Sequence, residues 1–177
     1  MQKKIKYAIF KTNWGYFGLA GTEYALLRTH LPCPKPDEIK KKLGKYLPGA
    51  QPYKTYFNQL QKQITAYFAG NCVDFALDIP IVLNSLAGFS ASVLSACRKI
   101  KFGQTISYGG LAENAGRPAA ARAVGSTLAK NPLPLLIPCH RVLRSDGTLG
   151  GFSAPGGKML KAKLLEHERT ALVNCSS

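Results

Sequence analysis

Apolar and aromatic residues alternate with polar ones over the first part of the chain, a pattern typical of strands. Turn-like residues interrupt the pattern at Asn13-Trp14-Gly15 and at Ala20-Gly21-Thr22. We therefore expect a β-meander with strands over residues 5–10, 16–19 and 24–31. A similar alternation from Val73 to Leu77 predicts a further, half-buried strand.

Two segments after the meander predict helices. A short, lysine-rich helix is expected over residues 37–46, and we interpret its lysines as a solvated face, with weak DNA contact as the alternative. From Tyr53 to Phe68, apolar residues recur at helical spacing, and Gly70 follows where a C-terminal cap is expected. We interpret this continuous apolar stripe as part of the core.

The chain changes character around residues 79–88, and we place a domain boundary there, giving domains 1–84 and 85–177. After the boundary, apolar spacing predicts a helix over residues 89–101. The predicted fold class is α+β: a small N-terminal β-meander plus helices, then a mostly helical C-terminal domain with a winged-helix-like helix-turn-helix.

The helix-turn-helix is predicted from a pair of short helical segments. Ser107 is placed as the N-cap of the first helix, which runs to Ala115. Gly116 makes the turn, and Pro118 is expected as the first residue of a second helix that continues to Ala129.

The second helix has an unusual exposed face, on which one arginine stands among small residues. A helix that reads the major groove carries several long polar side chains, and this one does not. A small-faced helix suits close approach to the minor groove, and a single arginine suits entry into the base stack when a base is flipped out. An ordinary helix hairpin with an alanine-rich surface is the alternative. The face is predicted to hold Ala119, Arg122, Ala123, Ser126 and Thr127.

The amino-acid composition predicts a polyanionic partner. The formal net charge is +15, from 24 Lys and Arg against 9 Asp and Glu, and nucleic acid is the commonest partner for such an excess. No stretch approaches the roughly 18 consecutive apolar residues of a membrane span, and no apolar signal-peptide core follows Met1. We expect an intracellular protein with no membrane partner, in the cytoplasm, or in the nucleus if its source is eukaryotic.

The candidate chemistry lies in the run Pro138-Cys139-His140-Arg141-Val142, which follows the apolar segment 133–137. A cysteine beside a histidine suits a thiolate nucleophile, since a neighbouring base or positive charge raises the thiolate fraction. The alternative is a cysteine that acts as a small core hydrophobe. The five cysteines are widely spaced and form no Cys-x-x-Cys pair, so neither a disulfide framework nor a zinc cluster is indicated.

Four motifs stand out in the second half of the chain: 101–108 (Lys-Phe-Gly-Gln-Thr-Ile-Ser-Tyr), 120–125 (Ala-Ala-Arg-Ala-Val-Gly), Asn131-Pro132, and 137–142 (Ile-Pro-Cys-His-Arg-Val). Together they resemble the motifs of the O6-alkylguanine-DNA alkyltransferases. The resemblance covers roughly Leu60 to Glu168 and is loose over the N-terminal meander.

This resemblance implies a role for each matching residue. Cys139 is the expected alkyl acceptor, His140 the base that takes the thiol proton through a water, and Glu168 the group that holds and polarises the histidine. Asn131 is expected to pin the turn that leads to the active site. Tyr108 is expected to donate a proton toward the flipped guanine.

The resemblance also implies how DNA is bound. Arg122 corresponds to the residue that fills the vacated base position, and the other expected DNA contacts are Ala120, Ala121, Ser126 and Thr127. The backbone of Val142, together with Phe152 and Ser153, is expected to recognise the guanine edge.

The sequence departs from the family pattern in three places. Phe152 stands where the family often has a tyrosine, which removes one hydroxyl contact. The loop 154–157 is slightly long, so Glu166 is the fallback for Glu168. The human form of this family carries an N-terminal zinc site, two of whose ligand positions fall on Thr22 and Leu27 here. His30 and Cys33 are too few to replace them, so we expect no metal and no cofactor.

The resemblance implies direct-reversal DNA repair. An alkyl group on the O6 of guanine in double-stranded DNA, with the O4 of thymine as a second candidate, passes irreversibly to Cys139. The product is a thioether with no carbonyl for water to attack, so each chain, expected to be a monomer, acts once. Two other classes stay open: a non-catalytic binder of damaged DNA or helix-turn-helix regulator, and a cysteine hydrolase that turns over.

Overall fold

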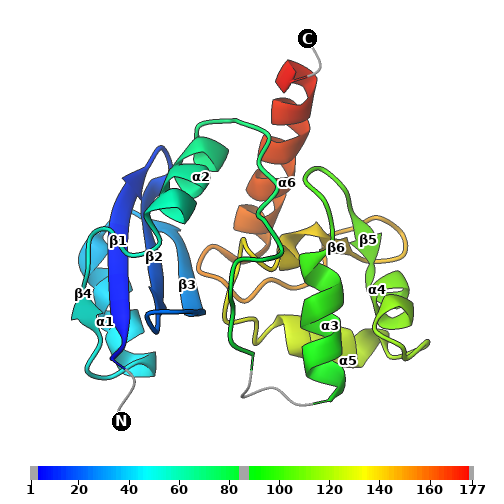
Figure 1. The fold of residues 1–177 in the computed structure, drawn as a ribbon. Helices are drawn as coiled ribbons and strands as arrows, with labels where there is room; N and C mark the ends of the chain where they lie inside the picture. Colours follow the sequence, from blue (N-terminus) through cyan, green and yellow to red (C-terminus); the bar gives the residue numbers. More distant parts are fainter. Residues whose placement is uncertain (1–3, 84–87, 176–177) are drawn as a thin grey trace. The chain divides into compact units, whose positions relative to one another are not determined.

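The computed structural model describes residues 4–83 and 88–175 and divides the chain into two compact units (Figure 1). The N-terminal unit comprises residues 1–82 and the C-terminal unit residues 83–177. The boundary predicted after residue 84 lies outside the described residues. No helix in the described ranges is long and apolar enough to span a membrane.

The N-terminal unit is built on a four-stranded sheet. Its first three strands form an antiparallel meander, as predicted, and a short fourth strand pairs in parallel with the first. The strands are β1 (Lys6–Thr12), β2 (Gly15–Gly21), β3 (Leu26–Cys33) and β4 (Gln51–Pro52), in the spatial order β3-β2-β1-β4.

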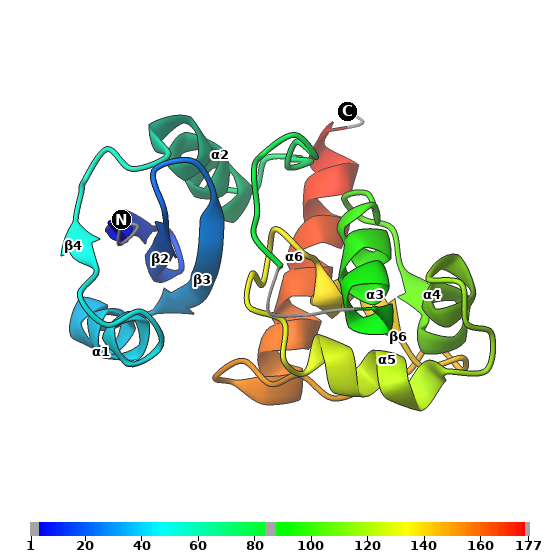
Figure 2. The same cartoon turned by 60° about the horizontal axis from the view of Figure 1, so that its bottom comes forward.

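Two helices cover the two faces of this sheet (Figure 2). Successive residues of a strand point to opposite faces, and β2 shows the result. Phe17 packs against Phe68 of α2 (Asn58–Phe68), with ring centroids 6.0 Å apart. Ala20 belongs to a buried cluster with Ile39 and Leu43 of α1 (Pro36–Tyr46).

Two predictions for this unit are wrong. The segment from Val73 to Leu77 forms no strand, and Leu77 is 52% exposed. Helix α2 begins at Asn58 rather than near Tyr53, because Phe57 has a left-handed backbone with φ of 50° that interrupts helical geometry.

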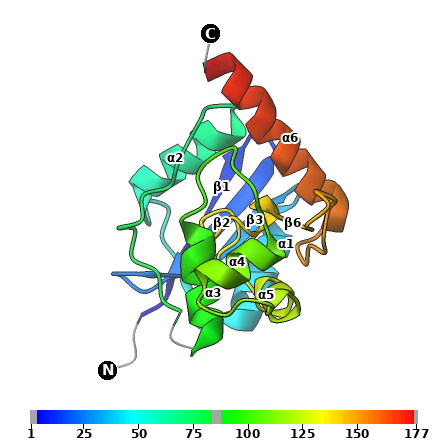
Figure 3. The same ribbon diagram turned by 90° about the vertical axis from the view of Figure 1, so that its right-hand side faces the viewer.

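The C-terminal unit is mostly helical (Figure 3). Helices α3, α4 and α5 pack together around the buried residues Val93, Leu111 and Val124. Its elements are α3 (Phe89–Arg98), β5 (Ile106–Ser107), α4 (Tyr108–Asn114), α5 (Ala121–Leu128), the 3-10 turn η1 (Cys139–Arg141), β6 (Val142–Leu143) and α6 (Gly157–Cys175).

A short parallel pair, β5 with β6, brings distant parts of this unit together. Ile106 lies opposite Val142, and Ser107 lies opposite Leu143. The start of α4 therefore lies beside the segment that follows Cys139.

The predicted helix pair is present, with a longer connection. The hydroxyl of Ser107 accepts a hydrogen bond from the backbone N–H of Gly110 at 3.0 Å, so its N-cap role is confirmed. The second helix begins at Ala121, not at Pro118. Gly116 and Ala119 both have positive φ, at 81° and 65°, so the chain between them cannot be helical.

Candidate active site

Cys139 lies at the end of a tightly folded, buried segment. Leu133, Leu135 and Ile137 are at most 1% exposed, and the backbone N–H of Ile137 donates to the carbonyl of Leu133 at 2.9 Å. Leu135 has φ of 78°, which reverses the chain within this short loop. Cys139 is a free thiol, 7% exposed, at the first position of η1.

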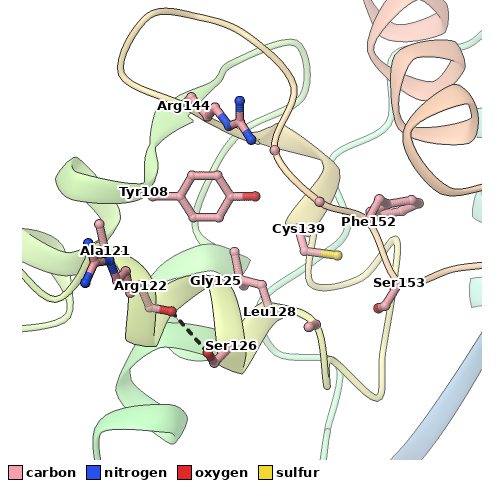
Figure 4. A pocket seen from close by; sticks show the side chains of 13 residues that line it. Tyr108, Ala121, Arg122, Gly125, Ser126, Leu128, Cys139, Arg144, Phe152 and Ser153 are labelled. Atoms are coloured by element: carbon pink, nitrogen blue, oxygen red, sulfur yellow. Dashed lines mark hydrogen bonds between the residues drawn. The ribbon is translucent and has the colours of Figure 1, made fainter.

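A pocket of about 680 Å³ opens over this thiol (Figure 4). The side chain of Tyr108 at the start of α4 and the sulfur of Cys139 point toward the same space. The pocket is lined by Tyr108, by Ala121, Arg122, Gly125, Ser126, Leu128 and Ala129 on or just after α5, by Cys139, and by Arg144, Gly150, Gly151, Phe152 and Ser153.

Asn131 ties the cysteine to the loop that precedes it. Its side-chain N–H group donates to the carbonyl of Ile137 at 2.8 Å and to the sulfur of Cys139 at 3.2 Å. Its side-chain oxygen accepts from the backbone N–H of Leu133 at 3.0 Å. One amide therefore fixes both ends of the loop and places a donor on the thiol.

His140 and Glu168 form a buried pair, with Nε2 and Oε1 2.7 Å apart and both residues 1% exposed. Within the described ranges, the His140 ring bonds to Glu168 and not to the sulfur of Cys139, whereas the backbone of His140 hydrogen-bonds to that sulfur. Glu166, the fallback partner, lies on the exposed side of α6 and pairs with Arg169 at 2.6 Å. The loop 154–157 therefore leaves Glu168, and not Glu166, beside the histidine.

The Glu168 carboxylate also accepts hydrogen bonds from the Arg141 side chain and from the backbone of Gly103. The Nε of Arg141 donates to both carboxylate oxygens, at 3.0 and 3.2 Å, and a further guanidinium nitrogen donates to one of them at 2.9 Å. The N–H of Gly103 donates at 3.0 Å. Arg141 is completed by the carbonyl of Ile100 at 2.6 Å, so the buried carboxylate and the buried guanidinium satisfy each other.

These contacts determine the charges of the site. Burial alone would raise the pKa of Glu168, but the hydrogen bonds and charges of His140 and Arg141 outweigh it and bring that pKa to about 2. Burial lowers the pKa of His140, against the opposing effect of Glu168. Burial raises the pKa of Cys139, although Asn131 and the charge of Lys161 pull it down. These directions favour a thiol at Cys139 and a neutral imidazole at His140 in the free protein.

Comparison with known proteins identifies the family to which both units belong. Residues 88–170 match the family model of the 6-O-methylguanine DNA methyltransferase DNA binding domain, and residues 5–81 match the ribonuclease-like domain of the same family. The chain belongs to the 6-O-methylguanine DNA methyltransferase family. It is 37% identical to a mouse methylated-DNA--protein-cysteine methyltransferase, over 93% of this chain and 82% of the mouse protein.

Two further relatives agree with this family assignment. A methylated-DNA--protein-cysteine methyltransferase from Metallosphaera sedula is 47% identical over 63% of this chain and 67% of its own. The crystal structure of Mycobacterium tuberculosis OGT in complex with DNA superposes with a TM-score of 0.77 and 30% identity, covering 94% of each chain.

The predicted DNA-facing residues of this methyltransferase-family chain divide into two groups. Arg122, Ala121 and Ser126 line the pocket, whereas Ala120 is the N-cap of α5 and lies outside the lining. Thr127 does not lie on the exposed face. It is 8% exposed, and its hydroxyl hydrogen-bonds with that of Ser90 at 3.2 Å, because α3 packs against this side of α5.

Of the three residues expected to recognise guanine, two line the pocket and one does not. Phe152 and Ser153 line the pocket. Val142 is fully buried, and its carbonyl accepts a hydrogen bond from Nζ of Lys161 at 2.6 Å. Within residues 4–83 and 88–175, no group of three or more His, Cys, Asp or Glu side chains could hold a metal ion.

Sequence reasoning missed two buried cations. Lys161 is completely buried 5.6 Å from the ring centroid of Tyr108, and Arg141 is 3% exposed. A signal for Lys161 was present, since it shares one stripe of α6 with Leu164, Glu168 and Ala171, at spacings of three, four and three residues.

Proposed function

We propose that this chain repairs double-stranded DNA by moving an alkyl group from the O6 of guanine to Cys139. The observation that carries the proposal is a free, nearly buried thiol at a pocket of about 680 Å³, held by Asn131 and followed by the His140–Glu168 pair. Membership of the methyltransferase family supports the same reaction.

The histidine has a defined orientation for this chemistry. Because Glu168 is ionised, it accepts a hydrogen bond from the Nε2–H of His140 and leaves Nδ1 as the basic nitrogen. Nδ1 takes the thiol proton through a bridging water, and the imidazolium that forms is stabilised by the carboxylate. This is the relay of a cysteine hydrolase, stopped after its first transfer.

The transfer step conserves atoms and charge. The sulfur of Cys139 forms a bond to the alkyl carbon, the bond from that carbon to O6 breaks, and its electron pair stays on the guanine. The phenol of Tyr108 donates a proton to the guanine, and the proton that His140 took from the thiol returns to the phenolate, whose reprotonation is favoured because burial raises the pKa of Tyr108. The thioether formed has no leaving group that water displaces, so each chain reacts once.

The position of the thiol requires the base to leave the helix. Cys139 is 7% exposed below the pocket, and chemistry on a stacked base in a duplex needs that base to be flipped out. Helix α5 presents small residues beside Arg122 at the pocket, which suits close approach to a minor groove and a side chain that fills the vacated position. The Arg122→Ala variant is expected to lose activity on duplex DNA and to retain reaction with a free alkylguanine base.

The decisive experiment is mass spectrometry of the intact chain and its peptides after reaction with excess duplex DNA containing O6-methylguanine. We expect one methyl group per chain, on the peptide that contains Cys139. The Cys139→Ser variant should bind the DNA and gain no methyl, while Cys97→Ser, which alters a fully buried thiol on α3, should still react. Duplexes with O4-methylthymine test the second lesion in the same assay.

Each alternative has its own outcome. Bound DNA with no adduct on the wild-type chain would identify a damage binder. Repaired DNA with unmodified protein would identify an enzyme that turns over. Either result would overturn the proposed function.

A further inference from the structure

Arg144 is a pocket residue that the proposed reaction does not use. It follows β6 and begins a tight turn in which its N–H donates to the carbonyl of Thr148 at 2.9 Å, and its own carbonyl accepts from Gly147 at 2.9 Å. The Asp146 carboxylate accepts from the backbone and hydroxyl of Thr148, at 3.0 and 2.7 Å. The turn is therefore fixed by its own hydrogen bonds, and the arginine projects from a defined point.

The guanidinium of Arg144 has no hydrogen bond or ion pair within the parts of the chain that the structure describes, and the residue is exposed. By contrast, the guanidinium of Arg141, three residues earlier, donates its hydrogen bonds to Glu168 and to the carbonyl of Ile100. One oxygen of the Asp146 carboxylate accepts both bonds from Thr148, and the charge of Arg144 lowers the pKa of Asp146 without an ion pair between them. The guanidinium of Arg144 is thus left at the edge of the pocket without a bonded anion.

Two arginines line this pocket from different elements, Arg122 on α5 and Arg144 on the turn after β6 (Figure 4). The phenol of Tyr108 extends between the α5 side and the turn, toward Cys139. If a guanine enters to reach the sulfur, its own sugar and phosphates stay outside, because a phosphate charge cannot follow the base into a buried site without a large desolvation cost. The rim that carries Arg144 is then where those phosphates pass.

We propose that Arg144 binds a backbone phosphate adjacent to the alkylated nucleotide and holds that nucleotide in its extruded position. The inference rests on the proposed function and adds a positioning residue to it. A guanidinium presents paired N–H groups that match two phosphate oxygens, which an ammonium cannot do. Arg122 would fill the space that the base leaves, and Arg144 would hold the displaced strand.

The test compares substrates with and without phosphate. Arg144→Ala should slow alkyl transfer from a lesion-containing duplex by about tenfold, as expected for one lost charge-assisted contact, and should leave the rate with free O6-benzylguanine base within about twofold. Its binding to duplex DNA should show a log–log salt slope smaller by about one. Arg144→Lys should fall between the two. The charge-matched control is Arg169→Ala, on the exposed side of α6 and outside the pocket, which should match the wild type on both substrates.

Neutral phosphates identify the contact directly. A duplex with a single methylphosphonate beside the lesion should slow the wild type to the Arg144→Ala rate at one of the two flanking positions, and should not slow the variant further. Additive losses at both positions, or equal losses on duplex and free base, would overturn the proposal and assign Arg144 to the support of Tyr108. Failure of the wild type to form the Cys139 adduct would instead overturn the proposed function.

Discussion

Replacing Glu168 with glutamine removes the charge on which His140, Arg141 and the N–H of Gly103 converge. Burial by itself would raise the pKa of this carboxyl, but its partners bring the pKa from an ordinary value of 4.5 to about 2. One pKa unit corresponds to about 1.4 kcal/mol, so the ionised group stabilises the folded unit by about 3 kcal/mol. Removing one partner of a buried ion pair costs about 3–5 kcal/mol in general. We therefore expect Glu168→Gln to lower the free energy of unfolding of the C-terminal unit by about 3–5 kcal/mol.

The assay must report on the C-terminal unit. Trp14 is the single tryptophan and lies in the N-terminal unit, so its fluorescence does not report the relevant transition. Urea unfolding followed by hydrogen exchange of peptides from α6 measures the C-terminal unit by itself. The matched control is Glu166→Gln on the same helix, which removes an exposed pair with Arg169 and should change stability little.

The pH dependence supplies a second test of the same carboxylate. Its folded pKa lies below its unfolded value, so its contribution is fully present above about pH 4.5 and is lost as the pH falls through about 2. Between these limits the wild type should lose stability more steeply than Glu168→Gln. Burial lowers the pKa of His140, so this histidine adds its own acid sensitivity below its ordinary pKa of 6.5, and the quantity compared is the difference between the wild type and Glu168→Gln, which both contain it. Equal stability of the two glutamine variants, or identical acid slopes of variant and wild type, would refute the reasoning.

Two further substitutions test the cation and the shape of the pocket. Lys161→Met removes a buried charge that lowers the pKa of the Cys139 thiol. The pH profile of alkyl transfer should therefore move to higher pH, and a rise of about one unit in that pKa would lower the rate at neutral pH about tenfold. The control Lys158→Met, an exposed change on the same helix, should leave the profile in place. Gly150→Ala places a methyl group against the hydroxyl of Tyr108, whereas at Gly151 a methyl group meets nothing within 4 Å. Single-turnover rates should therefore fall about 10- to 100-fold for Gly150→Ala and stay near wild type for Gly151→Ala.

The features that sequence predicted well depend on nearby residues. The Ser107 cap bonds to an N–H three residues away, and Asn131 reaches its partners within eight residues. The meander strands pair with their neighbours in the chain, so their apolar runs and turns suffice to identify them. Such features are encoded within a short window of sequence.

The features that sequence missed depend on distant partners. Strand β4 exists because Gln51 lies beside Lys6, whereas the segment from Val73 to Leu77, with equal alternation, forms no strand. Thr127 turns inward because Ser90, 37 residues earlier, meets it from α3. A polar residue is expected at the surface unless its buried partner is known, so the sequence alone placed Thr127 on the exposed face.

The directions of the pKa shifts at Cys139 and His140 favour a sulfur that becomes nucleophilic only when substrate is bound. Burial raises the pKa of Cys139 and lowers that of His140, so transfer of the proton between them is unfavourable in the free protein. Asn131 and Lys161 act in the opposite direction on the thiol, and Glu168 favours the imidazolium. In the proposed reaction, a bound guanine that accepts a proton from the pocket would supply driving force for this transfer. In the proposed single-turnover reaction, a thiol at rest would also resist soluble alkylating and oxidising agents, because the thiolate is the reactive form.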